Sequence, residues 1–281
     1  MIGDIPWTTA AAITAMAFCC EYTDSTLGMG YGTILTPLLM LLFGYHPLQV
    51  VPAVLLSELL TGLLAGFTHH SVGNVDLKPK TLRIGRIIRS LRRNGVRDSV
   101  RRGLPVHLRI ALLIGLCSVF GAVASVAVAT SVPKFWLKLY IGVLVLVIGL
   151  FIVLSHATTH TFSWKRVVGL GLLASFNKGL SGGGYGPVVT GGQILAGISG
   201  RSAVGITSLA EALTCAVGVA AYVVGGKAAS WELAPLLVVG GVASVPLAAL
   251  TVRSIDPDRM RVWIGVATTA LGALTLVKLF T

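Results

Sequence analysis

The chain has 281 residues, of which 54% are hydrophobic and only 11% are charged. A soluble domain carries about 25% charged residues, so this composition excludes a soluble globular protein and indicates a polytopic membrane protein. The formal net charge of +12 is large, and its meaning depends on where the basic residues lie along the chain.

The first half of the chain contains five hydrophobic segments. The first, at 8–27, ends in Glu21 and Asp24, and it lacks the basic start of a cleavable signal peptide. The second is too short to cross a bilayer squarely, since a span needs about 20 residues. We therefore expect these two segments to form a broken or re-entrant helix whose tip faces a protein-lined cavity. The four segments after the first lie at 31–43, 48–70, 106–130 and 135–154.

The second half repeats this arrangement in a matching register. Gly28 to Thr36 aligns with Gly182 to Thr190, and further on Glu58 aligns with Glu211. Later still, Gly149 aligns with Gly272. The corresponding segments lie at 167–176, 187–197, 201–224, 231–252 and 259–280. The sequence thus predicts an all-α membrane protein built from two repeats, 1–155 and 156–281.

The number of crossings and the basic residues together predict the membrane topology. Each half has three full-length segments and a short pair that crosses twice or not at all, so each half crosses an odd number of times and the halves are inverted. The loop at about 74–105 is strongly basic, which places it in the cytoplasm by the positive-inside rule. Both termini are then external to the cytoplasmic (inner) membrane. Inversion also brings six further basic residues inside: Lys165, Arg166, Arg201, Arg253, Arg259 and Arg261.

Part of the basic loop has the pattern of an amphipathic helix. In 81–93, Ile84, Ile87 and Leu91 share one helical face while arginines occupy the others. Such a helix is expected to lie on anionic lipid headgroups. Binding to nucleic acid would fit the charge alone, but the apolar stripe favours lipid, and we expect no nucleic-acid partner.

The second half contains a glycine-rich break with a cation inside otherwise apolar sequence. Lys178 precedes a run of glycines, and Pro187 can open a new helix at its first turn. The unpaired N–H groups and the positive dipole end of that helix would face the break, which makes an anion site. Close helix packing in lipid is an alternative explanation of the glycines. Because such breaks recur at corresponding positions of two halves, they indicate a transporter binding site at the repeat interface.

The predicted substrate-binding residues are the cation, the break glycines and the polar residues beside them. They are Asn177, Lys178, Ser181, Gly182, Gly183, Gly184, Tyr185, Gly186 and Thr190 in the second half, with Gly28, Gly30, Tyr31, Gly32 and Thr36 in the first. Two alternatives stay open: Lys178 can snorkel to an interface, and the tyrosines can belong to an interfacial aromatic belt.

Two acidic residues lie at matching positions inside the third segments. Acids inside spans commonly serve proton relays, so Glu58 and Glu211 are the predicted proton-coupling residues. A hydrogen bond to a neighbouring helix break fits their positions equally well. Glu21 and Asp24 are candidates for pairing with Lys178 when no substrate is bound.

The cysteines and histidines indicate less about function than the glycine breaks do. The four cysteines lie in apolar segments without zinc spacing and are read as reduced small hydrophobes: Cys19, Cys20, Cys117 and Cys215. His69 and His70 end a segment and are expected at the interface. An integral-membrane enzyme using Cys19 and Cys20, or these histidines, is an alternative, although no metal site, cofactor or nucleotide motif is expected.

In these motifs the chain resembles the TauE/SafE sulfite exporter family. The resemblance rests on the paired glycine segments, on TPLL at 36–39 followed by Gly44 and Pro47, and on SGGGYGP at 181–187. It covers nearly the whole chain and implies transport, most often export, of sulfite, sulfonates or related small sulfur anions. Met29 departs from the pattern, because a third consecutive glycine would fit better and would leave the first half more open to ligand.

The sequence therefore favours a secondary transporter. Export, as the direction of transport, is implied only by the family resemblance. An anion channel remains the main alternative, and it differs from coupled transport in following only the electrochemical gradient. The oligomeric state, a homo-oligomer included, stays open.

Overall fold

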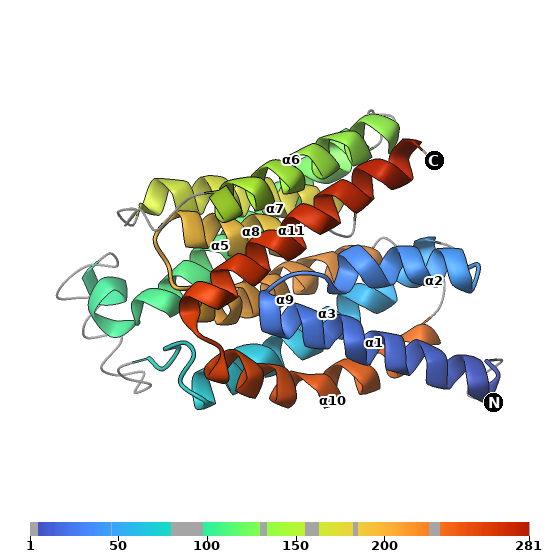
Figure 1. The fold of residues 1–281 in the computed structure, drawn as a ribbon, viewed down its shortest axis with the longest axis horizontal. Helices are drawn as coiled ribbons and strands as arrows, with labels where there is room; N and C mark the ends of the chain where they lie inside the picture. Colours follow the sequence, from blue (N-terminus) through green and yellow to red (C-terminus); the bar gives the residue numbers. More distant parts are fainter. Residues whose placement is uncertain are drawn as a thin grey trace.

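The computed structural model describes residues 5–45, 47–79, 98–129, 134–154, 163–181, 185–224 and 231–280. The elements in these ranges are helices that lie side by side along one direction (Figure 1). In the first half they are α1 (Trp7–Leu27), η1 (Tyr31–Leu35), α2 (Thr36–Leu42), α3 (Pro47–Ser71), α5 (Val106–Ala129) and α6 (Lys134–Leu154). In the second half they are α7 (Trp164–Ser181), α8 (Tyr185–Leu195), α9 (Gly200–Val224), α10 (Leu233–Ser254) and α11 (Pro257–Phe280).

Each predicted hydrophobic segment is helical where the structure describes it, and the prediction of an all-helical fold is confirmed for the described residues. Among the described residues, four helices are long and apolar enough to cross a membrane: Gln49–Ser71, Gly200–Val224, Ala234–Ser254 and Val262–Leu279. Shorter apolar stretches lie at Val106–Gly121 and Val145–Leu154. Helices suit this setting because they satisfy their own backbone hydrogen bonds without water.

The glycines of the first half end one helix and turn the chain back. Gly28 caps α1 in the left-handed conformation with a φ of 72°, and Gly30 has a φ of 131°. Side chains with a Cβ rarely adopt such values, which is why glycine is needed here. The chain then re-enters a helix as the π-helical turn η1, followed by α2. In Figure 1, α1 starts at the end that carries the N-terminus, and η1 with α2 returns toward that end.

The helices of the two halves exchange packing partners. α1 packs on α10, and α7, its counterpart in the second half, packs on α5, the counterpart of α10. α3 packs on its counterpart α9, and α6 packs on its counterpart α11. The contact between α6 and α11 is reciprocal at the level of residues, because Gly149 lies against the backbone of Thr269 while Gly272 lies against that of Leu146. The sequence register that matches Gly149 with Gly272 also matches Leu146 with Thr269.

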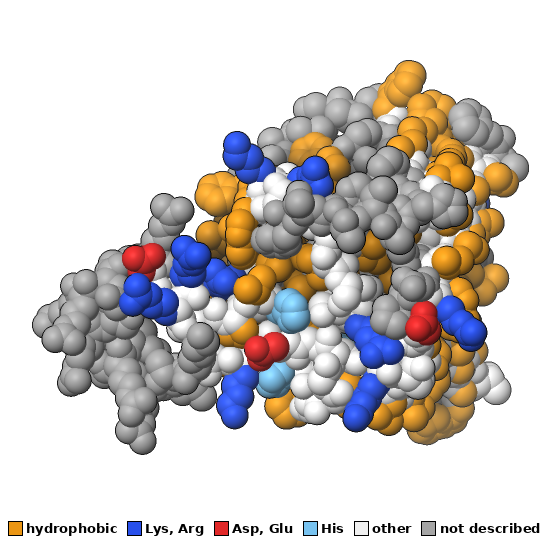
Figure 2. Space-filling model, turned by 60° about the vertical axis from the view of Figure 1, so that its left-hand side comes forward, with side chains coloured by type: hydrophobic (Ala, Val, Ile, Leu, Met, Phe, Trp, Pro, Cys, Tyr) orange, Lys and Arg blue, Asp and Glu red, His pale blue; other side chains and the backbone are white. Residues whose placement is uncertain are grey.

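Polar and apolar side chains are distributed as expected for a bundle in lipid. The outer surface carries large exposed apolar side chains, among them Phe67, Phe120, Leu247 and Trp263, while acidic residues and one lysine are buried in the centre. Figure 2 shows basic side chains on the end opposite the termini, over the starts of α5, α7 and α9 and the turn from α10 to α11. The predicted helix at 81–93 lies outside the described residues.

Candidate functional site

The centre of the bundle holds a buried ion-pair cluster between the two halves. The ammonium group of Lys178 on α7 lies 2.6 Å from Oε2 of Glu58 on α3 and 2.8 Å from Oε1 of Glu211 on α9. All three residues are at most 5% exposed. The structure therefore brings together the predicted cation and both predicted acids, and it places Lys178 inside the protein rather than at an interface.

The carboxylate of Glu58 also binds the first glycine break. Its Oε1 accepts a hydrogen bond from the backbone N–H of Gly32 at 3.0 Å, at the start of η1. Its Oε2 accepts from Lys178, and the thiol of Cys215 lies 3.4 Å away. A carboxylate held between a helix-start N–H and an ammonium group occupies an anion-binding position. The Glu58 carboxylate thus joins Lys178 of the second half to the glycine break of the first half.

Two further acids complete this acidic centre. Asp24 accepts a 3.3 Å hydrogen bond from the backbone N–H of Tyr31, so a second N–H group of the break is bound to a carboxyl group. Glu21 accepts from the hydroxyl groups of Ser25, at 2.7 Å, and Thr61, at 2.9 Å. Glu21 and Asp24 were candidates for pairing with Lys178, but in this structure the ion pairs of the lysine are with Glu58 and Glu211. A cavity of about 10 Å³, room for about one water molecule, lies among the four acids, Thr61, Gly62 and Ser208.

The two predicted tyrosines are buried and belong to separate hydroxyl networks. The hydroxyl of Tyr31 lies 2.8 Å from that of Ser57, and the hydroxyl of Tyr185 accepts from Thr214 at 3.2 Å. Thr214 in turn bonds Ser118, which accepts from Ser175 at 2.9 Å. Both tyrosines are at most 1% exposed, so the interfacial aromatic belt is excluded for them.

The two glycine breaks contact each other directly. The hydroxyl of Thr190 on α8 donates to the carbonyl of Gly28 at 2.8 Å and also reaches Thr207 on α9. A methyl group on Gly186 would overlap the backbone of Gly28 and Met29, and one on Gly28 would overlap Thr190. These glycines allow the two halves of the chain to approach closely, as the packing explanation of the glycines expects.

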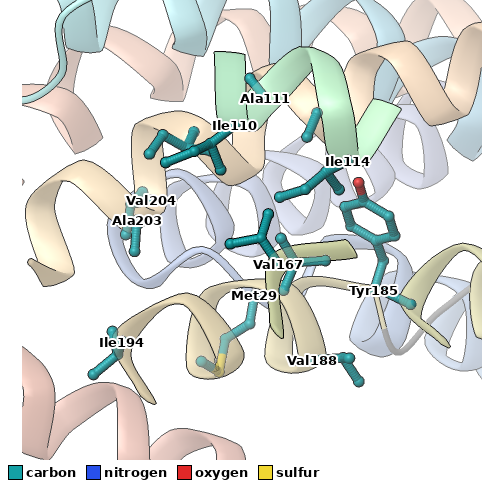
Figure 3. Packing of buried hydrophobic residues seen from close by; sticks show 14 of the residues in the cluster. Met29, Ile110, Ala111, Ile114, Val167, Tyr185, Val188, Ile194, Ala203 and Val204 are labelled. Atoms are coloured by element: carbon teal, nitrogen blue, oxygen red, sulfur yellow. The ribbon is translucent and has the colours of Figure 1, made fainter. Parts of the chain in front are cut away.

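Met29 fills the space that a glycine would leave at the first break. Its side chain is fully buried in an apolar cluster built largely from α5, α7, α8 and α9 (Figure 3). Its backbone lies against Gly186 of α8, and its sulfur accepts a hydrogen bond from Thr268 at 3.0 Å. The side chain of Met29 is therefore part of the packed interior at the first break.

Several predicted site residues have no described surroundings. Gly182, Gly183 and Gly184 lie outside the described residues, and so do the side chains of Asn177 and Ser181, which are part of α7. Thr36 is described, and its hydroxyl is buried without a hydrogen-bond partner among the described residues. It starts α2, directly after η1.

The histidines and cysteines form no common site. His69 is fully buried, so its predicted interfacial position is wrong, and its Nε2 lies 3.0 Å from the carbonyl of Ser25. His70 contacts the carbonyl of Val75. The four cysteines are free thiols, and only Cys19 is exposed. Within the described ranges, no group of three or more His, Cys, Asp or Glu side chains is arranged to hold a metal ion.

Sequence reasoning missed the hydroxyl partners and the role of Asp24 in the centre. One signal for Asp24 was available, because the register that places Gly28 over Gly182 also places Asp24 over Lys178. The repeats therefore carry opposite charges at equivalent positions. The hydroxyl partners Ser57, Thr61, Ser118, Ser175 and Thr214 have no pattern that separates them from ordinary small residues of packed membrane helices.

Comparisons with known proteins agree with this architecture. The chain is 26% identical over 272 residues to the probable membrane transporter protein YtnM of Bacillus subtilis (strain 168), covering 92% of this chain and 79% of that protein. No solved structure matches the chain. The family model "Sulfite exporter TauE/SafE" matches residues 13–88 and 94–275. This multi-pass membrane protein therefore belongs to the sulfite exporter TauE/SafE family of transporters.

Proposed function

We propose that the protein is a proton-coupled secondary transporter that exports sulfite or a small organosulfonate. One observation carries the proposal: the Glu58 carboxylate lies between the ammonium group of Lys178 and the N–H of Gly32. A sulfite or sulfonate group resembles a carboxylate in offering several acceptor oxygens that share a negative charge. Such a group can take the place of Glu58 at the same two donors.

Exchange of Glu58 for a substrate anion requires that the carboxylate lose its charge. Breaking a buried ion pair while leaving both charges in place costs about 3–5 kcal/mol, so Glu58 leaves Lys178 most easily as a neutral carboxylic acid. Glu211 is bound to the same ammonium group and is the second acceptor of a proton. Each monovalent anion bound then accompanies one proton taken up, and the net charge of the site is unchanged.

The charge balance also explains why a lysine is tolerated at this depth. A lysine at the centre of a membrane helix costs about 2.5–3.5 kcal/mol on insertion scales. In this conformation two carboxylates offset the cost, and in the loaded carrier the substrate does so. Lys178 therefore keeps a negative partner throughout the cycle, and a carrier without either partner is disfavoured.

The architecture that we propose is a pair of inverted repeats, 1–155 and 156–281. Three observations support it: the exchanged packing partners, the reciprocal glycine contacts, and the return of α1–α2 and α7–α8 from opposite ends of the bundle (Figure 1). The basic end would face the cytoplasm, with both termini outside. We keep the helix at 81–93 on anionic lipid as part of this proposal.

Reconstituted transport tests the function. Purified protein in liposomes would be given outward or inward gradients of sulfite, methanesulfonate, sulfate, phosphate or chloride while internal pH is followed. We expect sulfite or the sulfonate to move together with protons, and Lys178→Met to abolish the movement. Lys165→Met, which changes an exposed lysine on the same helix, is the matched control. Movement of none of the sulfur anions by wild type would refute the substrate assignment.

The same experiment separates the transporter from an anion channel. A channel conducts the anion without proton movement, and its flux follows the electrochemical gradient alone. A carrier with the exchange described above shows proton movement in a fixed ratio to anion movement.

Membership of a transporter family implies that the chain is not an enzyme.

A further inference from the structure

His69 lies where four helices meet, between the acidic centre and the basic end of the bundle. It is fully buried in the last turn of α3. Its Nε2 lies 3.0 Å from the carbonyl of Ser25 in the last turn of α1, and its Cβ lies against Gly205 of α9. Asn74, which follows α3, places its side-chain nitrogen 2.9 Å from Nδ1 of His69 and 2.9 Å from the carbonyl of Ala249 on α10.

The hydrogen bonds fix which nitrogen of His69 carries the proton. The carbonyl of Ala249 can only accept, so the group of Asn74 that faces it is the amide NH₂, which can only donate. Nδ1 of His69 is therefore the acceptor, and Nε2 carries the hydrogen and donates to Ser25. Each polar group in this chain of contacts has a partner of the correct kind, so His69 links α1 to α3 and, through Asn74, to α10.

The hydrogen-bonded contacts continue from His69 to the acidic centre. Ser25, whose carbonyl is held by His69, donates its hydroxyl to Glu21, one helical turn earlier on α1. Asp24, which binds the N–H of Tyr31 at the break, is the residue before Ser25. The position of the end of α1 relative to α3 and α10 therefore sets where two acids of the centre lie.

We propose that His69 and Asn74 are positioning residues that hold the bundle closed at its basic end. The inference rests on the proposed transporter function for its meaning, because a carrier must open one end to load or release substrate. Opening at this end requires α1 to separate from α3 and α10. Such a movement breaks the hydrogen bond from His69 to Ser25, together with those between Thr61 and Glu21 and between Tyr22 and Thr251. Asn74 acts through His69, because its amide donates both to Nδ1 of His69 and to the carbonyl of Ala249 on α10.

The test measures opening directly, without any substrate. Thr26 is buried beside Ser25 and its hydroxyl has no partner among the described residues, so Thr26→Cys is a mild reporter of opening. In purified protein whose four native cysteines are replaced by serine, the rate of maleimide labelling at this position would be followed. A net hydrogen bond is worth about 0.5–1.5 kcal/mol, so we expect His69→Phe and Asn74→Ala to label about three- to tenfold faster.

Rescue by a conservative variant separates positioning from simple packing. His69→Gln can place an amide N–H near the carbonyl of Ser25, and we expect it to label close to the wild-type rate. His70→Gln alters the adjacent histidine, which bonds the loop at Val75 and not α1, and serves as the control.

Every outcome of the labelling bears on the link. If His69→Phe does not fold, as judged by gel filtration, Asn74→Ala provides the same test from the other side of the link. Equal labelling of wild type and both disruptive variants, or equally fast labelling of His69→Gln and His69→Phe, would overturn the proposal. Because labelling needs no substrate, failure of sulfite transport would refute the proposed function and leave this result intact.

Discussion

The hydroxyl of Thr190 donates a 2.8 Å hydrogen bond to the carbonyl of Gly28, which joins the glycine break of the first half to the middle of α8 in the second. The two residues are 162 positions apart in the chain. Gly28 ends α1 with a positive φ, and the carbonyl of a helix end is an acceptor that needs a partner. Thr190 supplies that partner from across the interface between the repeats.

The first prediction concerns the two roles of Gly28. Gly28→Ala introduces strain of about 1–2 kcal/mol from the positive φ, and its methyl group would also overlap Thr190. Gly44→Ala is the matched variant, because Gly44 has nearly the same φ of 71° but no atom within 4 Å of a new methyl group. We expect Gly28→Ala to lower the melting temperature in detergent distinctly more than Gly44→Ala. Equal losses would show that the interface between the breaks is loose.

The extent of most helices could be predicted from the sequence, since hydrophobic runs and glycine breaks are local signals. The segment expected at 167–176 is longer, because α7 runs from Trp164 to Ser181 and includes Lys178. The segment predicted at 48–70 is α3, Pro47–Ser71, and the one at 201–224 is α9, Gly200–Val224. The single segment predicted at 31–43 divides into η1 and α2, because the chain re-enters a helix directly after Gly30. The central polar residues were also identifiable, because charges inside apolar segments are rare.

The partners of those residues could not be predicted. Lys178 is 120 residues from Glu58, and four acids compete for it, so only the packing of α3, α7 and α9 decides which ones it meets. His69 shows the same limit, since a histidine at the end of a hydrophobic segment usually faces the interface. Its burial depends on Ser25 and Asn74, which sequence alone does not bring close to it.

The second prediction concerns topology. Single cysteines at Asn94 and at Lys227 should react with a membrane-impermeant maleimide from opposite sides, the first from the cytoplasm and the second from outside. The physical reason is that the basic end of the bundle and the end that carries the termini face opposite sides of the membrane. Labelling of intact cells, before and after permeabilisation, checks this. Reaction of both positions from one face would refute the inverted arrangement.

The third prediction concerns the acids bound to Lys178. Protonation of Glu58 or Glu211 releases the ammonium group for the anion, so the affinity of wild type for sulfite should rise as pH falls. Glu58→Gln and Glu211→Gln remove a titrating group, and we expect either change to flatten this pH dependence while binding is retained. Binding across a pH series by calorimetry measures both effects.

Exposed Glu232 provides the control for that series, because Glu232→Gln removes an acid outside the centre. At neutral pH, Glu58→Gln should raise the affinity for sulfite more than Glu211→Gln does, since the Glu58 carboxylate occupies both Lys178 and the N–H of Gly32. An unchanged pH dependence in both variants would make these acids structural and would move proton coupling elsewhere.

The last prediction separates the structural role of Lys178 from its role in binding. Lys178→Met leaves Glu58 and Glu211 buried without a cation, so at neutral pH the variant should lose about 3–5 kcal/mol of stability. Combining it with Glu58→Gln and Glu211→Gln removes the uncompensated charges and should restore most of the melting temperature. Binding of sulfite should not return, because the positive charge for the anion is still missing.

Lys178→Arg should keep part of the binding, weakened because a planar guanidinium replaces a compact ammonium group. Charge-assisted hydrogen bonds are worth about 1.5–3 kcal/mol, so Lys178→Met should bind sulfite roughly ten- to a hundredfold more weakly than wild type. Calorimetry together with thermal melting of all four proteins measures both quantities, and wild-type affinity in the stable triple variant would exclude Lys178 from the anion site.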